Sequence, residues 1–98
     1  MYIGPVFIPN PLVLAPMAGV TDLAFRRTCR EKGAGLTVTE MVSAKALCYQ
    51  DRKSRGLLKL APGEHPVSAQ IFGSDPVCMA EAAQIAAELS GADLIDIN

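Results

Sequence analysis

Short apolar runs alternate with helical segments along this chain, and that alternation limits the fold more than any other feature of the sequence. Four apolar runs are the predicted strands: residues 12–15, 36–41, 67–71 and 94–98. Three segments between them are the predicted helices: residues 21–32, 43–48 and 74–90. Short apolar strands that alternate with helices form parallel sheets covered by helices. The sequence therefore predicts an α/β fold with a parallel sheet.

Capping residues indicate where the first two helices begin. Thr21 is the expected cap of the first helix, on which Phe25 and Cys29 share one face and two arginines, Arg26 and Arg30, share another. Ser43 is the expected cap of the short second helix. The segment between this helix and the third strand, residues 49–66, is charged and interrupted by Gly and Pro, so it is expected to be irregular.

The last helix has the strongest start and stop signals. Ser74-Asp75-Pro76 places a capping side chain before a proline in the first turn, and Gly91 follows the last helical residue. A stripe of mostly small residues is expected to face the sheet: Met79, Ala83, Ala86 and Leu89 or Ser90. Cys78 is expected on the helix surface.

The number of strands indicates part of a larger fold. Tyr2–Ile3 and Val6–Ile8 flank Gly4-Pro5 and predict a short N-terminal hairpin. Four parallel strands are half of an eight-stranded barrel or half of a doubly wound sheet, and a complete barrel takes about 250 residues. Because 98 residues are less than half of that length, we expect a fragment of a larger fold of one of these two kinds.

Composition and cysteine content exclude several classes of protein. A net charge of −1 provides no basic surface for nucleic acid. The three cysteines are odd in number and widely spaced, which fits neither a disulfide framework nor a metal site. The apolar N-terminus has no positive start and is interrupted by Gly and Pro, so we expect neither a signal peptide nor a membrane span. Reduced thiols and a cytoplasmic location are expected.

Polar residues and a loop of small residues follow the predicted strands. Ala15-Pro16-Met17-Ala18-Gly19 follows the first strand, and Gln70 and Asn98 lie near the ends of the third and fourth. In parallel α/β folds these ends share the edge where ligands bind. Small residues allow the backbone to approach a flat ligand, Met17 can pack on an aromatic ring, and Gln70 can both donate to and accept from an imide. This combination favours a flavin.

Four motifs resemble the tRNA-dihydrouridine synthases: "LAPMAGVTDLAFRR", "TEMVSAKAL", "VSAQIFGSDPVCMAEAA" and the final "DIN". The resemblance implies an FMN-dependent (β/α)8 barrel enzyme with a C-terminal helical domain, which uses NADPH to reduce a uridine in tRNA to dihydrouridine. It therefore implies that residues 1–98 are the first half of a (β/α)8 TIM barrel, truncated after the fourth strand. It also implies that Pro16, Met17, Ala18 and Gln70 contact the flavin. By the same resemblance, Asn98 lies near the uracil and the flavin.

Other parts of the implied active site are not in this sequence. The family pattern continues after Asn98 with Met-Gly-Cys-Pro, and the cysteine of that motif is the implied proton donor. None of Cys29, Cys48 and Cys78 matches it. The later active-site lysine and histidine and the phosphate-binding loops are also outside the sequence. We therefore expect these residues alone not to reduce uridine, and to bind FMN weakly.

The sequence is compatible with two other functions, and several side chains have two possible roles. One alternative is a different FMN barrel oxidoreductase that acts on a small molecule. The other is a non-catalytic half-barrel whose exposed strand edges self-associate. Glu40 is expected either to touch ligand or to pair with a cation, and Lys45 and residues 52–55 either to meet tRNA phosphates or to be solvated. His65 is expected to be a loop residue with no role.

Overall fold

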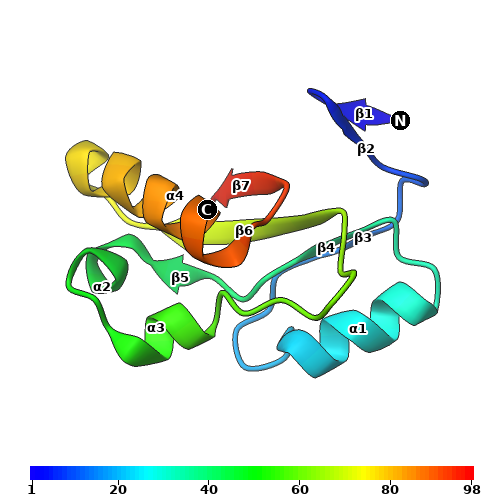
Figure 1. The fold of residues 1–98 in the computed structure, drawn as a ribbon, viewed down its shortest axis with the longest axis horizontal. Coiled ribbons are helices and arrows are strands. Elements are labelled where there is room, and N and C mark those ends of the chain that lie inside the picture. Colours follow the sequence, from blue (N-terminus) through cyan, green and yellow to red (C-terminus); the bar gives the residue numbers. More distant parts are fainter.

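A computed structural model describes all residues 1–98 and contains a five-stranded parallel sheet (Figure 1). The strands of this sheet are β3 (Val13–Leu14), β4 (Leu36–Val38), β5 (Val42–Ser43), β6 (Val67–Phe72) and β7 (Leu94–Ile97). β3 pairs with β4, β4 and β5 pair with the two ends of β6, and β7 pairs with β6 as well. This confirms the predicted α/β fold with a parallel sheet. The strand order is consistent with the start of a TIM barrel.

The second predicted strand, residues 36–41, is interrupted in the structure. The backbone N–H of Thr39 donates to the Ser68 carbonyl, while the Thr39 hydroxyl accepts from the backbone N–H of Gln70. Because a side chain takes the place of a backbone partner here, Glu40 and Met41 leave the sheet. Pairing resumes at Val42. The interruption turns the two intervening residues into part of the sheet's C-terminal edge.

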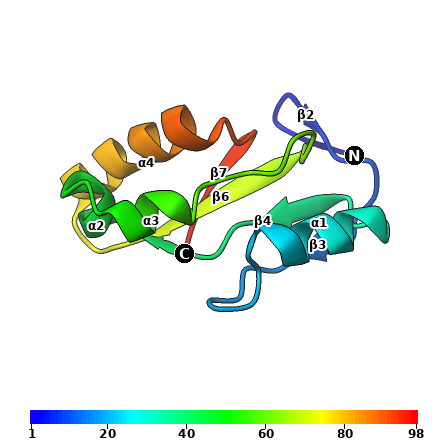
Figure 2. The same cartoon turned by 60° about the horizontal axis from the view of Figure 1, so that its bottom comes forward.

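Four helices accompany the sheet: α1 (Leu23–Glu31), α2 (Ala44–Cys48), α3 (Arg52–Gly56) and α4 (Pro76–Ser90). Figures 1 and 2 show α4 lying along β6 and β7, and α1 beside β3 and β4. The predicted cap of α1 was wrong, because Asp22 rather than Thr21 accepts the hydrogen bond from Phe25 N. The predicted start of α2 at Ser43 is confirmed.

The signals of α4 are confirmed, whereas α3 was missed. Asp75 caps α4, Pro76 is its first residue and Gly91 follows its end. α3 lies in the segment expected to be irregular, and it is a single turn capped by Asp51. The backbone and hydroxyl groups of Ser54 both donate to Asp51, which lowers the pKa of that carboxyl group. A turn this short has no apolar periodicity to reveal it.

The main core lies between the sheet, α2 and α4. Its fully buried members are Val42, Ala44, Leu47, Leu58, Ala69, Ile71, Ala82 and Ala86. Most of the predicted stripe of α4 is confirmed, because Ala86 is buried and Met79 and Ala83 pack against the core. The prediction missed Ala82, which is fully buried, and Leu89 is 48% exposed, so Ser90 is the better of the two alternatives. Cys78, expected on the surface, packs against this core. Alanine is buried here because its small side chain allows the helix backbone to approach the sheet closely.

The N-terminal hairpin is also confirmed. β1 (Tyr2–Ile3) and β2 (Val6–Phe7) pair antiparallel, and both figures show this hairpin toward the end of the sheet at which β6 begins. Val13 on β3 and Ile97 on β7 are exposed. None of the helices combines the length and the apolar character needed to cross a membrane.

Candidate functional site

The loop after β3 is folded back on itself around Met17. The backbone N–H groups of Val20 and Thr21 both donate to the Met17 carbonyl at 2.9 Å. The Thr21 hydroxyl accepts from Met17 N at 3.0 Å and donates to Met17 O at 3.2 Å. Thr21 is fully buried. Its side chain therefore closes the loop instead of capping α1, which explains why the helix begins one residue later than predicted.

Glu40, in the segment between β4 and β5, holds the same loop. Gly19 has a φ of +77°, a conformation that side chains with a Cβ disfavour, and its N–H donates to Glu40 Oε1 at 2.6 Å. Glu40 forms no ion pair with any lysine or arginine. Of the two roles expected for Glu40, pairing with a cation was therefore wrong. One of its oxygens orients the loop.

The arrangement leaves one backbone donor of the Met17–Thr21 turn free. Met17, Gly19, Val20 and Thr21 all donate their N–H groups within the chain, whereas Ala18 N–H has no partner. Ala18 is exposed and Met17 is 42% exposed, while Pro16, which has no N–H, is half-buried. The loop thus presents a low-bulk surface with a single available amide and a soft thioether side chain.

Gln70 and Asn98 meet at the C-terminal ends of β6 and β7. Gln70 Nε2 donates to Asp96 Oδ2 at 2.6 Å, and Asn98 Nδ2 lies 3.4 Å from Gln70 Oε1 and 3.9 Å from Met41 Sδ. Gln70 is 6% exposed, whereas Asp96 and Asn98 are exposed. The Gln70 amide keeps one N–H and one lone pair without a partner. It can therefore still donate and accept at once.

The predicted site residues all lie along this one edge of the sheet. Asn98 contacts Gln70 directly, as expected for neighbouring strands. The Met17 loop makes no direct hydrogen bond to Gln70, and the two are linked by the segment Glu40–Met41, which bonds to Gly19 on one side and approaches Asn98 on the other. The roles implied for Pro16, Met17, Ala18, Gln70 and Asn98 in ligand contact stay predictions.

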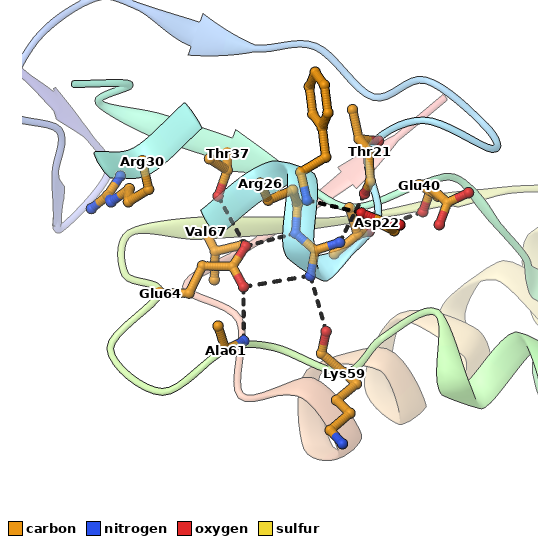
Figure 3. A network of polar contacts seen from close by, with 12 residues as sticks. Thr21, Asp22, Arg26, Arg30, Thr37, Glu40, Lys59, Ala61, Glu64 and Val67 are labelled. Atoms are coloured by element: carbon orange, nitrogen blue, oxygen red, sulfur yellow. Dashed lines mark hydrogen bonds and ion pairs between the residues drawn. The ribbon is translucent and has the colours of Figure 1, made fainter. Parts of the chain in front are cut away.

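An ion pair that the sequence did not reveal lies beneath the loop (Figure 3). Arg26 Nε donates to Glu64 Oε1 at 2.6 Å, and the two side chains are 1% and 2% exposed. Arg26 Nη1 donates to the Thr21 carbonyl at 2.9 Å. The arginine face of α1 is thus the buried face at this position, and Phe25 is 40% exposed. The sequence placed Arg26 on a different helix face from Phe25 and Cys29, and nothing in that pattern indicated that Arg26 is buried.

A hollow of about 570 Å³ lies between α2 and the start of α4. Within it, the Sγ atoms of Cys48 and Cys78 are 3.1 Å apart, and all three cysteines are free thiols. The hydrogen bond with Cys78, together with burial, raises the pKa of Cys48 to about 12. Lys45 lines this hollow and residues 52, 53 and 55 are exposed on α3. No group of three or more His, Cys, Asp or Glu side chains is placed to hold a metal ion.

His65 lies at the opposite, N-terminal edge and has a structural contact that was not expected. Its Nδ1 atom is 2.8 Å from Asp93 Oδ2, which also accepts from the backbone N–H of Val67 at 2.9 Å. Partial burial alone would raise the pKa of Asp93, but the hydrogen bonds from His65 and Val67 outweigh it and lower that pKa. His65 is thus a loop residue, as expected, with a structural contact to Asp93, and the prediction that it has no functional role stays a prediction.

Comparison with known families identifies the kind of protein. The family model described as dihydrouridine synthase matches residues 13–98, which include the whole C-terminal edge of the sheet. The chain belongs to the dihydrouridine synthase family. This confirms the resemblance drawn from its motifs.

Similar dihydrouridine synthases occur in several bacteria. The chain is 53% identical over 96 residues to tRNA-dihydrouridine synthase B of Pseudomonas aeruginosa, and 50% identical over 100 residues to the protein of the same name from Salmonella typhimurium. Its identity to tRNA-dihydrouridine synthase B of Escherichia coli K12 is 49% over 100 residues. These alignments cover 98% to 100% of this chain but only 29% to 30% of the relatives' length.

Proposed function

We propose that residues 1–98 form the first half of the FMN-binding (β/α)8 barrel of a tRNA-dihydrouridine synthase. The complete protein would use NADPH as reductant and convert a uridine in tRNA to 5,6-dihydrouridine. Support comes from the family of the chain, from the names of relatives at about 50% identity, and from the parallel strand order. A cytoplasmic location, where tRNA is available, is part of the same proposal.

The unpartnered amide of Ala18 is the observation that carries the flavin proposal. It lies on an exposed turn whose other amides are all bonded within the chain, so it is oriented without being used. The exposed Met17 side chain beside it is suited to packing on an aromatic ring. Residues at this edge therefore fit one face and one polar edge of an isoalloxazine ring, with Pro16, Met17, Ala18 and Gln70 as its contacts.

FMN, when bound, would supply the hydride chemistry that no side chain of this segment can provide. The residues here would bind and orient. Gln70 has a free donor and a free acceptor on one amide, which match an imide that offers both. Asn98 hydrogen-bonds to Gln70 and is exposed, so it would contact the uracil next to the flavin.

Proton donation to the reduced uracil is not assigned to any residue of this segment. None of Cys29, Cys48 and Cys78 takes part in the contacts along the C-terminal edge. We propose that the donor is a cysteine in the Met-Gly-Cys-Pro motif that would follow Asn98, and that the flavin phosphate is held by later loops. Residues 1–98 alone would therefore bind FMN weakly and would not reduce uridine.

The test is carried out on the full-length protein that contains this segment. We expect it to purify with a flavin absorbance spectrum, to oxidise NADPH, and to form dihydrouridine in tRNA taken from a strain that lacks its dihydrouridine synthases. Mass spectrometry of digested tRNA measures the product. FMN binding with reduction of small molecules but not tRNA would replace this proposal with a small-molecule oxidoreductase. Absence of both flavin and activity would favour a non-catalytic half-barrel.

The exposed strands β3 and β7 lead to a separate proposal for residues 1–98 studied in isolation. Val13 and Ile97 are 50% and 68% exposed on strands that each have one unpaired edge. Unpaired edges with apolar residues promote association between sheets. We expect sedimentation velocity to show dimers or larger species for this segment, whereas a monomer at all concentrations would contradict the proposal.

A further inference from the structure

We propose that Arg26 and Glu64 are positioning residues for the candidate flavin loop. Through Thr21, their buried ion pair fixes Met17 and so orients the free amide of Ala18 toward the ligand. The identity of that ligand as FMN rests on the proposed function. The orientation of the loop itself does not.

The ion pair is placed where water cannot substitute for it. Arg26 and Glu64 are joined by two contacts, Nε to Oε1 at 2.6 Å and Nη2 to Oε2 at 3.4 Å. A charged group that is almost fully buried loses its hydration, so its hydrogen bonds must be made within the protein. The Arg26 guanidinium therefore has a fixed position relative to the carboxylate.

Three further contacts tie this pair to the rest of the fold. The Glu64 carboxylate accepts from Thr37 Oγ1 on β4 at 3.2 Å and from Ala61 N at 2.9 Å. The Arg26 Nη2 group also donates to the Lys59 carbonyl at 2.9 Å. Figure 3 shows these groups converging on the guanidinium and the carboxylate. The position of the pair is therefore set by the sheet and by the segment that precedes β6.

The pair then acts on the loop through a short series of direct hydrogen bonds. Arg26 Nη1 donates to the Thr21 carbonyl, and the Thr21 hydroxyl contacts both the N–H and the carbonyl of Met17. Ala18 is the next residue, so the direction of its N–H depends on the Met17 peptide. The bond from Arg26 is buried and the two bonds of the Thr21 hydroxyl are partly buried, and all three are direct.

Stability alone does not account for a buried ion pair at this position. Removing two charges from water costs free energy that their attraction repays only in part, and apolar residues of similar size often stabilise a protein as well or better. What an apolar pair cannot supply is a donor directed at the Thr21 carbonyl. The positioning proposal therefore predicts an effect on the loop that persists even when the fold is kept stable.

The experiment uses the full-length protein with four variants. Arg26→Met combined with Glu64→Leu removes the charges together, and Thr21→Val removes only the hydroxyl that contacts Met17. Thr21→Ser keeps a hydroxyl and serves as the conservative variant. Leu47→Ala on α2 destabilises the main core at a residue that takes no part in the hydrogen bonds of the loop, and controls for loss of stability. The measurements are hydrogen exchange at the Met17 amide in flavin-free protein and the FMN dissociation constant.

In the charge-pair and Thr21→Val variants, we expect the hydrogen-exchange rate of the Met17 amide and the FMN dissociation constant each to rise about tenfold. A factor of ten corresponds to the loss of one ordinary hydrogen bond. Thr21→Ser should lie near wild type, and Leu47→Ala should change neither quantity. The proposal is overturned if both disrupting variants behave like Leu47→Ala. If the wild type binds no FMN, the proposed function fails, while Met17 exchange still decides the positioning proposal.

Discussion

The two edges of the parallel sheet use polar groups in different ways. At the N-terminal edge, Asp93 accepts hydrogen bonds from His65 and Val67. Arg30, at the end of α1, donates to four backbone carbonyls: those of Ala34, Gly35, His65 and Pro66. Polar groups at this edge are thus directed at backbone and side-chain groups of the fold itself.

At the C-terminal edge, several polar groups have hydrogen-bonding capacity that the chain does not use. Ala18 N–H has no partner, the Gln70 amide is only half used, and Asp96 and Asn98 are exposed. The unpartnered amide of Ala18 nevertheless has a defined direction, because Thr21 and Glu40 fix the loop around it. The two edges therefore differ in whether their polar groups keep unused hydrogen-bonding capacity, which a ligand site would require. Ligands of parallel α/β folds bind at this same edge.

The largest expected effect comes from breaking the buried pair beneath the C-terminal edge. Glu64→Ala leaves the Arg26 charge buried without a partner, so we expect a loss of about 3–5 kcal/mol in the free energy of unfolding. His65→Ala breaks the exposed pair at the other edge and should cost about 0–1 kcal/mol. Urea denaturation of both full-length variants measures the difference. Equal losses would contradict the burial argument, because the His65 side chain is 51% exposed.

The next effect separates ligand binding from stability. Gln70→Ala removes the amide whose unused N–H and lone pair are proposed to bind the flavin. We therefore expect the FMN dissociation constant to rise about tenfold, the cost of an unmade hydrogen bond. Isothermal titration with FMN measures it. Asp93→Asn at the opposite edge is the matched control and should leave the constant unchanged. Unchanged FMN affinity in Gln70→Ala would remove that residue from the proposed flavin site.

Sequence reasoning located the strands and the C-terminal edge because both depend on local signals. Apolar runs, Ser43, Asp75-Pro76 and Gly91 act within a few residues, and the structure uses them as expected. Thr21 was assigned wrongly because its hydroxyl has two possible partners, a helix amide or the Met17 peptide. The choice depends on how the loop folds back, which is not a property of the helix sequence.

The contacts that position the candidate site are non-local, and this is why the sequence did not reveal them. Arg26 and Glu64 are separated by 38 residues, and Gly19 and Glu40 by 21. An arginine on the polar side of a helix is normally solvated, so its burial depends on a carboxylate supplied from elsewhere. The family resemblance supplied candidate ligand contacts, but it did not supply the groups that hold them in place.

A third, smaller effect tests whether the shape of the loop matters for the C-terminal edge. Gly19 and Gly91 both have positive φ, +77° and +69°, and both have open space where a Cβ would lie. Changing either to Ala should cost about 1 kcal/mol or somewhat more in stability through backbone strain alone. Only Gly19→Ala should also weaken FMN binding, because strain at this position would displace the N–H that donates to Glu40 and so change the shape of the loop. Equal FMN affinities for the two variants, measured by titration, would argue against a role for the loop.

The smallest effect concerns the N-terminal edge and depends on pH. Hydrogen bonds from His65 and Val67 outweigh the effect of burial and hold the pKa of Asp93 below its unfolded value of about 3.9, so the ionised carboxylate stabilises the fold. This stabilisation is complete above about pH 5 and is lost as the pH falls through the lower folded pKa. We expect Asp93→Asn to reduce stability at pH 7 by less than about 1 kcal/mol, since the pair is largely exposed. Urea midpoints for the two proteins should therefore converge as the pH falls below about 5, and a constant gap would show that the charge of Asp93 does not contribute.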